Sequence, residues 1–286
     1  MPELPEVEAL ALFVTSHAGG AIIERAELGS LSALKTYAPP LDALIGRTVE
    51  GASRRGKYLC IDVGGLWLVS HLARAGWLHW RDPVPAGRAR PGRGPLALRV
   101  GLSSGAGFDL TEQGTEKRLA LWLVADPAAV EGVARLGPDP LGPGFDQTRF
   151  ASVLAGAPGQ LKSVLADQAV LAGVGNAYSD EILWVAKLSP FKAAAKLTSP
   201  EVERLYSALT GVLRDAVERS LGQAAKELKD AKRAGMAVHG RAGLACPECG
   251  TTVREVWLAN RSFQYCPQCQ TGGKVLADRR LSRLLK

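Results

Sequence analysis

The sequence predicts an α+β fold, in which a β-sandwich or barrel is followed by helices and a small cysteine-containing hairpin. Three observations predict it. Short apolar runs rich in β-branched residues, with no helices between them, fill residues 22–124; helical periodicity dominates residues 148–221; and two Cys-x-x-Cys pairs lie near the end. The 286 residues are 47% hydrophobic and 22% charged, which indicates folded cores and leaves room for two domains.

The chain begins with a predicted helix that ends near Gly19-Gly20. Pro5 suits the first helical position, and the acidic Glu6 and Glu8 suit the first turn, where the helix dipole favours negative charge. The apolar stripe behind them consists of Val7, Leu10 and Val14.

The same terminus can also carry chemistry. If an aminopeptidase removes Met1, Pro2 becomes a free secondary amine one residue from the Glu3 carboxylate. Because an α-amino group titrates near pH 8, against roughly 10.4 for lysine, more of it is unprotonated at neutral pH. Such an amine can attack a carbonyl-like carbon, for example C1′ of a deoxyribose. The alternative interpretation is that this segment only starts a helix, and the two are compatible.

The predicted strands are separated by turn signals such as Gly64-Gly65 and residues 103–105, and by a long Pro/Gly/Arg loop at residues 82–95. Regularly spaced strands of this kind are typical of a sandwich or barrel. They are Ile22–Leu28, Thr48–Ser53, Tyr58–Val63, Leu66–His71, Gly76–Trp80, Leu96–Leu102 and Arg118–Val124.

A Pro/Gly-rich stretch at residues 137–144 predicts a hinge, and helices are predicted beyond it. Residues 172–176, Ala-Gly-Val-Gly-Asn, form a tight turn between two of the helices, which predicts a helix-two-turn-helix. Backbone N–H groups at the start of the following helix can bind a phosphate. Residues 222–240 are basic and weakly periodic, so we expect a mobile loop. The predicted helices are 148–154, 160–172, 177–186 and 200–221.

The two Cys-x-x-Cys pairs, separated by 16 residues, are the strongest local signal. Two knuckles of this spacing place four thiolates around one zinc, and the strand-like segments between them predict a zinc ribbon. Four cysteines leave no open coordination position, so the zinc is structural rather than catalytic. Cys60 lies in an apolar strand and is interpreted as a buried small hydrophobe. The predicted ligands are Cys246, Cys249, Cys266 and Cys269.

The net charge of +7 lies at one end of the chain, because residues 221–286 hold 12 Lys/Arg and 5 Asp/Glu. Such a distribution predicts a polyanion partner, most simply nucleic acid; a solubilising basic tail is the alternative. No run approaches the ~18 apolar residues of a membrane span, and no leader-like segment precedes the first helix. We therefore expect a cytoplasmic, nucleoid-associated monomer that does not bind a membrane.

Several motifs occur together and in order: Pro-Glu-Leu-Pro-Glu-Val-Glu at 2–8, Arg-Gly-Lys-Tyr at 55–58, Ser-His-Leu at 70–72, Gly-Val-Gly-Asn-Ala-Tyr-Ser-Asp-Glu at 173–181, and the double Cys-x-x-Cys. In this combination the chain resembles the formamidopyrimidine-DNA glycosylase and endonuclease VIII family of base-excision repair enzymes. The resemblance spans residues 1 to about 270. It implies an N-terminal helix on a two-layered β-sandwich, a helix-two-turn-helix domain and a zinc ribbon, with duplex DNA between two lobes.

The resemblance also implies roles for individual residues. Pro2 matches the proline that forms the Schiff base, Glu3 the general acid/base of ring opening, and Glu6 a further acidic site residue. Lys57 matches a lysine that contacts phosphate and assists catalysis. Phosphate-gripping positions are matched by His71, Asn176 and Arg261. Taken singly, Lys57 and His71 are also compatible with ordinary strand ends, and Arg261 with an exposed arginine.

Two departures from the family pattern concern the substrate. Arg74 stands where typical formamidopyrimidine enzymes have a methionine that fills the gap left by the extruded base, and the Arg-Arg-Phe-Gly loop is replaced by residues 111–118, Thr-Glu-Gln-Gly-Thr-Glu-Lys-Arg. Preference for 8-oxoguanine opposite cytosine therefore does not follow. The extension 271–286 adds four basic residues that predict further backbone contacts: Arg279, Arg280, Arg283 and Lys286.

These observations predict a bifunctional DNA glycosylase and AP lyase that excises oxidised bases through a Pro2 Schiff base and then eliminates the strand by β/δ-elimination. A non-catalytic binder of damaged DNA on the same scaffold is the alternative, and a zinc-ribbon transcription or translation factor is a third. The expected divisions are 1–133 (catalytic sandwich), 134–146 (hinge), 147–240 (helix-two-turn-helix domain), 241–270 (zinc ribbon) and 271–286 (basic extension).

Overall fold

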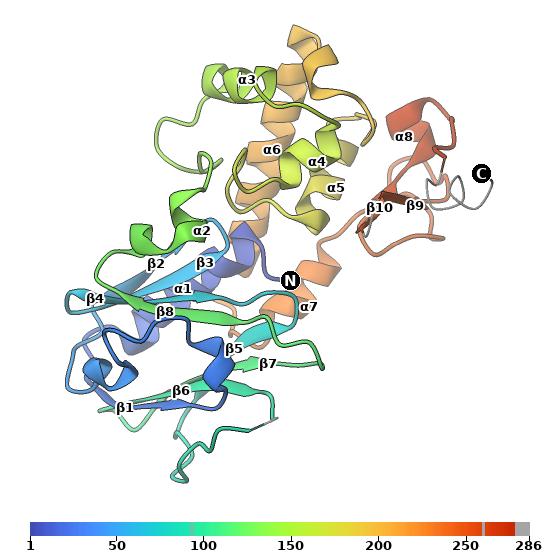
Figure 1. Cartoon of the computed structure of the whole chain (residues 1–286). Coiled ribbons are helices and arrows are strands. Elements are labelled where there is room, and N and C mark those ends of the chain that lie inside the picture. The colour runs from blue at the N-terminus through green and yellow to red at the C-terminus, as the bar shows by residue number, and fades with distance from the viewer. Residues whose placement is uncertain (93, 259–260, 278–286) are drawn as a thin grey trace, which may run out of the picture. The chain divides into compact units, whose positions relative to one another are not determined.

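The computed structural model describes residues 1–92, 94–258 and 261–277, and the chain forms two compact units (Figure 1). The first unit is Met1–Leu136 together with Ser220–Lys229. The second is Gly137–Arg219 together with the described residues from Asp230 onward. Among the described residues, no helix is both long enough and apolar enough to cross a membrane.

The first unit is built from helix α1 (Leu4–Ala18) and two four-stranded antiparallel sheets (Figure 1). One sheet has the order β1-β6-β7-β5 and the other β2-β3-β4-β8. Side chains alternate along the strands, so that Leu98 and Val100 from the first sheet and Leu59 and Ile61 from the second enter one core. The strand bounds are β1 Ile23–Leu28, β2 Gly51–Arg55, β3 Tyr58–Val63, β4 Leu66–His71, β5 Gly76–Arg81, β6 Leu96–Leu102, β7 Gly107–Glu112 and β8 Ala120–Val124.

The predicted α+β class and the sandwich are confirmed, and the seven predicted strands are present. The prediction missed β7, the strand Gly107–Glu112. All six of its residues are buried, although Phe108 and Leu110 alternate with polar residues, and Gly, Asp and Glu are residue types that are depleted in strands. Its Asp109 is an unusual strand residue, tolerated because Arg81 and Arg99 bind its carboxylate at 2.8 and 2.7 Å.

Helix α1 packs along β2 and β3 and buries the predicted apolar stripe. It starts one residue earlier than predicted: Leu4 is its first residue, and Pro5 occupies the second position. Glu3 is the N-cap, and a capping box with Glu6 defines the start. The C-terminal end matches the prediction, because the helix stops at Ala18 before Gly19 and Gly20.

The second unit contains most of the helices (Figure 1). The predicted helix 160–172 is shorter, because Gln168 caps the turn that follows: its amide donates to Val174 O at 2.7 Å and accepts from Gly173 N at 3.0 Å. The helix bounds are α2 Glu131–Ala134 in the first unit, then α3 Gln147–Ala155, α4 Leu161–Ala166, α5 Asn176–Val185 and α6 Ser199–Ser220. Short 3₁₀ helices are η1 Leu31–Ala33, η2 Leu41–Leu44, η3 Pro127–Ala129 and η4 Ala194–Lys196.

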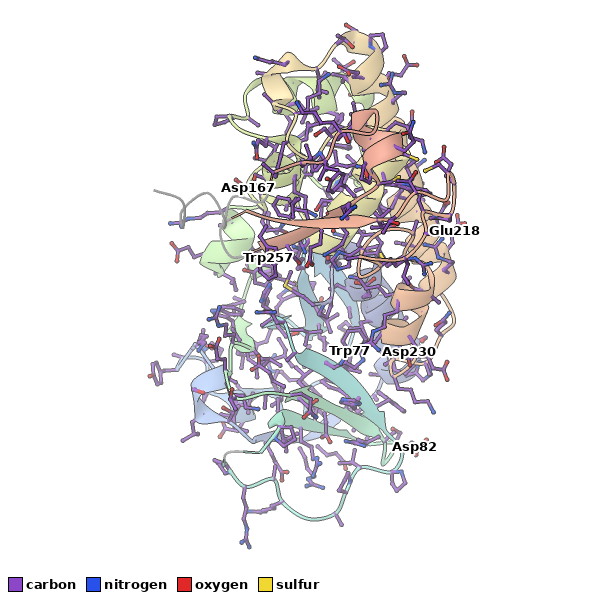
Figure 2. All side chains as sticks on the ribbon, turned by 90° about the vertical axis from the view of Figure 1, so that its right-hand side faces the viewer. Trp77, Asp82, Asp167, Glu218, Asp230 and Trp257 are labelled. Atoms are coloured by element: carbon purple, nitrogen blue, oxygen red, sulfur yellow. The ribbon has the colours of Figure 1, made fainter. Side chains whose placement is uncertain are left out.

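Residues 222–240 were expected to be a mobile loop of the helical domain, but they include helix α7 (Leu228–Ala234). Residues 220–229 group with the sandwich unit for a clear reason. The Trp77 indole N–H donates to Ala225 O at 2.7 Å, and both Ala225 and Leu228 are buried in the sandwich core. Trp77 is labelled on β5 in Figure 2. A tertiary contact with a strand far away in the sequence therefore orders this segment.

The C-terminal hairpin consists of β9 (Arg254–Leu258) and β10 (Arg261–Tyr265), followed by helix α8 (Pro267–Thr271). It lies where the zinc ribbon was predicted, and Figure 2 labels Trp257 on β9. Tyr265 and Phe263 are buried in a small core of their own with Val256. Such a small core needs additional support, which the four cysteines supply.

Candidate active site and zinc centre

The N-terminal end of α1 places two carboxylates in a buried position. Glu3 is 2% exposed and Glu6 is 1% exposed, and Pro2 beside them is also buried. The Glu3 backbone N–H donates to the Glu6 Oε2 at 2.8 Å. Carboxylates at a helix N-terminus lie beside backbone N–H groups that have no partner within the helix. The Glu6 carboxylate thus fixes the backbone at Glu3, the residue that follows Pro2.

Lys57 lies in the turn between β2 and β3 and is only 7% exposed. Arg55 pairs with Tyr58, so Gly56 and Lys57 form a two-residue hairpin turn, and Gly56 has the positive φ of 55° that the first position of a type II′ turn requires. The preceding Arg54 donates to the Glu8 carboxylate on α1 at 2.8 Å. The Lys57 turn is therefore tied to the helix that carries Glu3 and Glu6.

His71 is the last residue of β4 and stacks at a tilt on Tyr58, with ring centroids 4.9 Å apart. Burial lowers the pKa of His71 to about 4, and the Lys57 ammonium acts in the same direction. The imidazole is therefore neutral at pH 7. A phosphate contact by His71, as predicted from the resemblance, would use a neutral N–H donor rather than a positive charge.

Arg74 and the replaced loop lie next to each other. Arg74 is exposed in the turn between β4 and β5, and the Gln113 N–H donates to Ala75 O in that turn at 3.3 Å. The loop is closed by the buried Glu112, whose carboxylate accepts from the Arg118 N–H at 2.8 Å and the Leu119 N–H at 2.9 Å. Residues 113–118 are all exposed and none carries a large apolar side chain.

Asn176 is the first residue of α5, directly after the predicted two-glycine turn. Its side-chain amide donates to Ser262 O on β10 at 3.0 Å, which joins the helical turn to the hairpin. Its Oδ1 atom is buried and has no hydrogen-bond partner within the described residues. Arg261, the third predicted phosphate contact, begins β10, but its side chain lies outside the part of the chain that the structure describes, as do Arg279, Arg280, Arg283 and Lys286.

A buried ionic network, which was not predicted from the sequence, supports Asn176. Lys162 is 1% exposed as a whole residue, and its ammonium lies 2.5 Å from Asp180 Oδ1 and donates to Asn176 O at 2.6 Å. His239 Nδ1 lies 2.7 Å from the other Asp180 oxygen. A lysine on the apolar face of a helix, between Leu161 and Val164, was the signal available in the sequence.

The neighbouring Glu181 ties residues 237–239 to α5. Its carboxylate accepts three successive backbone N–H groups, from Ala237 at 2.8 Å, Val238 at 2.9 Å and His239 at 2.7 Å. Burial raises the pKa of Glu181, although the three donors act in the opposite direction. Asp180 and Glu181 on α5 therefore bind two segments that are distant in the sequence, Lys162 on α4 and residues 237–239.

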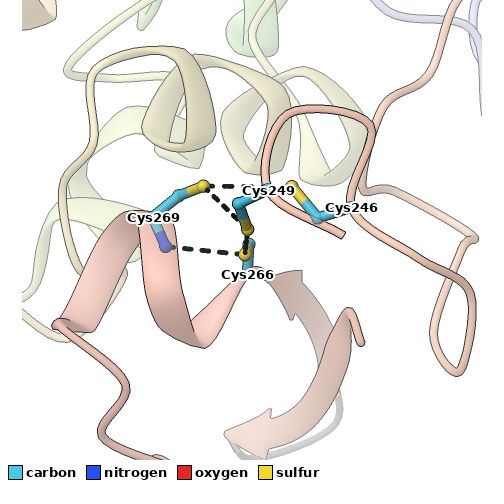
Figure 3. A group of neighbouring side chains, drawn as sticks. All are labelled: Cys246, Cys249, Cys266 and Cys269. Carbon is cyan, nitrogen blue, oxygen red and sulfur yellow. Dashed lines mark hydrogen bonds between the residues drawn. The ribbon is translucent and has the colours of Figure 1, made fainter. Parts of the chain in front are cut away.

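The four predicted cysteines lie together, with all Sγ atoms within 4.8 Å of one another (Figure 3). The Sγ separations are 3.9 Å for Cys246–Cys269, 3.4 Å for Cys249–Cys266 and 3.5 Å for Cys249–Cys269. A tetrahedral zinc with Zn–S bonds of about 2.3 Å requires separations of about 3.8 Å, so the geometry fits one zinc. Cys60 is fully buried in β3, as predicted, and burial raises its pKa to about 12.

Comparison with known proteins agrees with this geometry. Family models match along the chain: the formamidopyrimidine-DNA glycosylase N-terminal domain over residues 1–113, its H2TH domain over 136–227, and the zinc finger found in FPG and IleRS over 243–272. A formamidopyrimidine-DNA glycosylase from Symbiobacterium thermophilum is 36% identical over 98% of this chain and 93% of its own length. The chain belongs to the formamidopyrimidine-DNA glycosylase family.

Other members of the formamidopyrimidine-DNA glycosylase family are similar in sequence or in structure. An uncharacterised formamidopyrimidine-DNA glycosylase-like protein of Mycobacterium tuberculosis is 60% identical over 53% of this chain and 94% of its own length. Lactococcus lactis Fpg, solved with DNA containing N7-benzyl-Fapy-dG, has a TM-score of 0.83 and 26% identity, covering 94% of this chain and all of that one. The same enzyme solved with abasic-site DNA has a TM-score of 0.80 and 26% identity, covering 94% of this chain and 99% of that one.

Membership of this family confirms the resemblance inferred from the motifs, and with it the helix-two-turn-helix domain and the single structural zinc. A transcription or translation factor that shares only the zinc ribbon does not fit matches along the whole chain. The roles of Pro2, Glu3, Glu6, Lys57 and the phosphate-gripping residues stay predictions.

Proposed function

We propose that the protein is a bifunctional DNA glycosylase and AP lyase that removes oxidised bases from duplex DNA. The relatives are named DNA glycosylases, and the similar structures hold damaged-base or abasic-site DNA. The observation that carries the proposal is the terminus of α1, where Pro2 is buried beside the carboxylates of Glu3 and Glu6. We expect a monomer that acts in the cytoplasm on nucleoid DNA.

The chemistry begins once Met1 is removed and the Pro2 nitrogen is a free amine. The nitrogen attacks C1′ of an extruded nucleotide while the C1′–N bond breaks, and the base departs with the bonding pair and takes up a proton. Glu3 gives a proton to O4′ as the C1′–O4′ bond opens, which leaves an iminium between Pro2 and C1′. Loss of a C2′ proton then expels the 3′ phosphate, and a second elimination expels the 5′ phosphate before water hydrolyses the iminium.

Cationic and polar groups hold the DNA backbone in this proposal. Lys57 supplies positive charge at the reacting phosphate, where charge develops during elimination. Neighbouring phosphates are bound by His71, which is neutral, by the Asn176 amide and by the Arg261 guanidinium. Because each cationic contact releases counterions, affinity for DNA falls steeply with salt concentration. Each lost contact lowers the slope of the logarithm of the binding constant against the logarithm of salt concentration by about 0.9.

Borohydride trapping tests the mechanism. The native protein, incubated with abasic-site duplex and borohydride, forms a covalent adduct, and Glu3→Gln lowers its yield at least about 100-fold because ring opening loses its proton donor. Glu131→Gln, at an exposed site on α2, is the matched control and leaves the yield unchanged. A native protein without any adduct, or an undiminished adduct in Glu3→Gln, refutes the mechanism.

One observation favours a second candidate, a non-catalytic binder of damaged DNA. The turn with Arg74 and the loop 113–118 present polar or small exposed side chains where typical relatives have a Met/Phe wedge. Multiple-turnover incision of an abasic-site duplex excludes this candidate. A panel of duplexes with 8-oxoguanine, formamidopyrimidine, thymine glycol, 5-hydroxycytosine, dihydrouracil and an abasic site, each opposite all four bases, then identifies the substrate.

A further inference from the structure

A buried guanidinium links helix α1 to the turn that carries Lys57. The Arg54 side chain is 6% exposed, and its Nε donates to Glu8 Oε2 at 2.8 Å. The same guanidinium donates from Nη1 to Gly56 O at 3.4 Å, within the turn itself. Arg54 therefore contacts both the second turn of α1 and the residue directly before Lys57.

The turn needs such an anchor because of its geometry. Gly56 and Lys57 are the two residues at the tip of the β2–β3 hairpin, and Lys57 is nevertheless 7% exposed. Hairpin pairing fixes the shape of a two-residue turn, but not how its tip sits against a neighbouring helix. The pair Arg54–Glu8 supplies that second constraint, since a guanidinium forms directional bonds through fixed, planar N–H groups.

The ionic character of the pair makes this constraint stiff. A guanidinium that is removed from water requires anionic partners, and Glu8, whose side chain is 33% exposed, is one of them. Glu8 lies on α1 two residues after Glu6, which in turn holds the Glu3 backbone. A path of hydrogen bonds and a short stretch of helix thus connects the Lys57 turn to the residues at the terminus.

We propose that Arg54, paired with Glu8, is a positioning residue that sets the Lys57 turn against the first turn of α1 for the reaction at C1′. The inference rests on the proposed function, because it assigns Arg54 a part in the lyase chemistry. In this role Arg54 acts through Gly56 and Lys57 rather than on the substrate itself. Its loss slows the covalent step far more than it weakens DNA binding, because Lys57 keeps its charge and is one of several proposed phosphate contacts.

Glu8→Gln and Arg54→Lys test the proposal in the full-length protein. The first change keeps an acceptor oxygen but loses the negative charge, and the second keeps the positive charge but loses the planar fork. Because misplacement of a catalytic group by about 1 Å costs up to roughly 100-fold, we expect the single-turnover trapping rate on abasic-site duplex to fall about 10- to 100-fold. The Kd for a duplex with an uncleavable tetrahydrofuran site stays within about twofold, and the double variant is no slower than the slower single variant.

Arg25→Lys is the matched control, because Arg25 forms a comparable pair with Glu27 at 3.1 Å on β1, in the sheet that does not carry Lys57. It keeps the native trapping rate. Native rates in Glu8→Gln and Arg54→Lys overturn the proposal, as does a rise in Kd that accounts for the slower rate. If Arg54→Lys does not fold, Glu8→Gln alone decides. Absence of trapping in the native protein refutes the proposed function instead.

Discussion

The buried pair of Lys162 and Asp180 permits a quantitative prediction. Their side chains are 2% and 1% exposed and their charged atoms lie 2.5 Å apart, with Asn176 O as the further acceptor for the ammonium. The change Asp180→Asn keeps the shape but removes the carboxylate that neutralises the Lys162 charge. Because a stranded buried charge costs about 3–5 kcal/mol, we expect the helical unit to lose that much unfolding free energy.

The assay is hydrogen exchange at the amides of α4 and α5, since the chain has two units and a single global transition is not assured. A loss of about 3–5 kcal/mol accelerates exchange through global opening by roughly 150- to 5,000-fold. Asp230→Asn is the matched control: Asp230 pairs with Arg233 at 3.5 Å, with both side chains more than 80% exposed, so its loss costs at most about 0.5 kcal/mol.

Two results separate this reasoning from a general effect of substitution. Adding Lys162→Met to Asp180→Asn removes the stranded charge, so the double variant regains at least about half of the lost stability. A cost below about 1 kcal/mol for Asp180→Asn, or no recovery in the double variant, would refute the argument that the ion pair is buried and mutually dependent.

Three further predictions concern the other parts of the molecule. The pKa of His71 is about 4 in the folded protein and about 6.5 in the unfolded chain, so the unfolded chain takes up the proton first as pH falls. The contribution of the neutral imidazole to the free energy of unfolding is therefore fully present above pH 6.5 and is lost as pH falls toward 4. Urea unfolding of the sandwich should show about 2 kcal/mol of this loss between pH 7 and 5, and His71→Gln should remove it; equal pH slopes in both proteins would contradict the assignment. Cys249→Ser should lower the zinc content, measured by elemental analysis, well below one ion per chain and should speed amide exchange in β9 and β10. Cys60→Ala is the control and should retain one zinc per chain. The reverse pattern would exclude the assigned ligands. Trp77→Phe removes the donor to Ala225 O and should weaken the attachment of residues 222–229 by about 1 kcal/mol, seen as faster exchange there, while Trp67→Phe on β4 serves as control; unchanged exchange would mean that the indole bond does not hold the segment.

Much of the fold could be predicted because its signals are local. Turn residues such as Gly64 and Gly65 separate strands, an acidic first turn marks the start of α1, and two Cys-x-x-Cys pairs predict the zinc ribbon. Strand β7 was not predicted because Gly107, Asp109 and Glu112 are residue types that are uncommon in strands, and the partners of Asp109, Arg81 and Arg99, come from other strands. A charge in a strand looks unfavourable until the partners that neutralise it are known.

The candidate site divides in the same way. Pro2, Glu3 and Lys57 belong to short contiguous motifs, so the sequence was sufficient to predict them as site residues, and their roles stay predictions. The supporting residues belong to no contiguous motif: Arg54 is bonded to Glu8, and Lys162 to Asp180, across 46 and 18 positions of the chain. A pair of this kind has no spacing rule, because chain folding rather than helical or strand periodicity brings the partners together.

The sequence by itself determined the order of the domains, the zinc ligands and the family of the chain, because each depends on residue types at short, fixed spacings. Only the tertiary structure decided which carboxylates and cations are buried, that His71 is neutral at pH 7, and that residues 220–229 join the sandwich. The physical reason is that desolvation and ion pairing depend on distances in space. Two residues far apart in the chain acquire such a distance only when the whole core has formed.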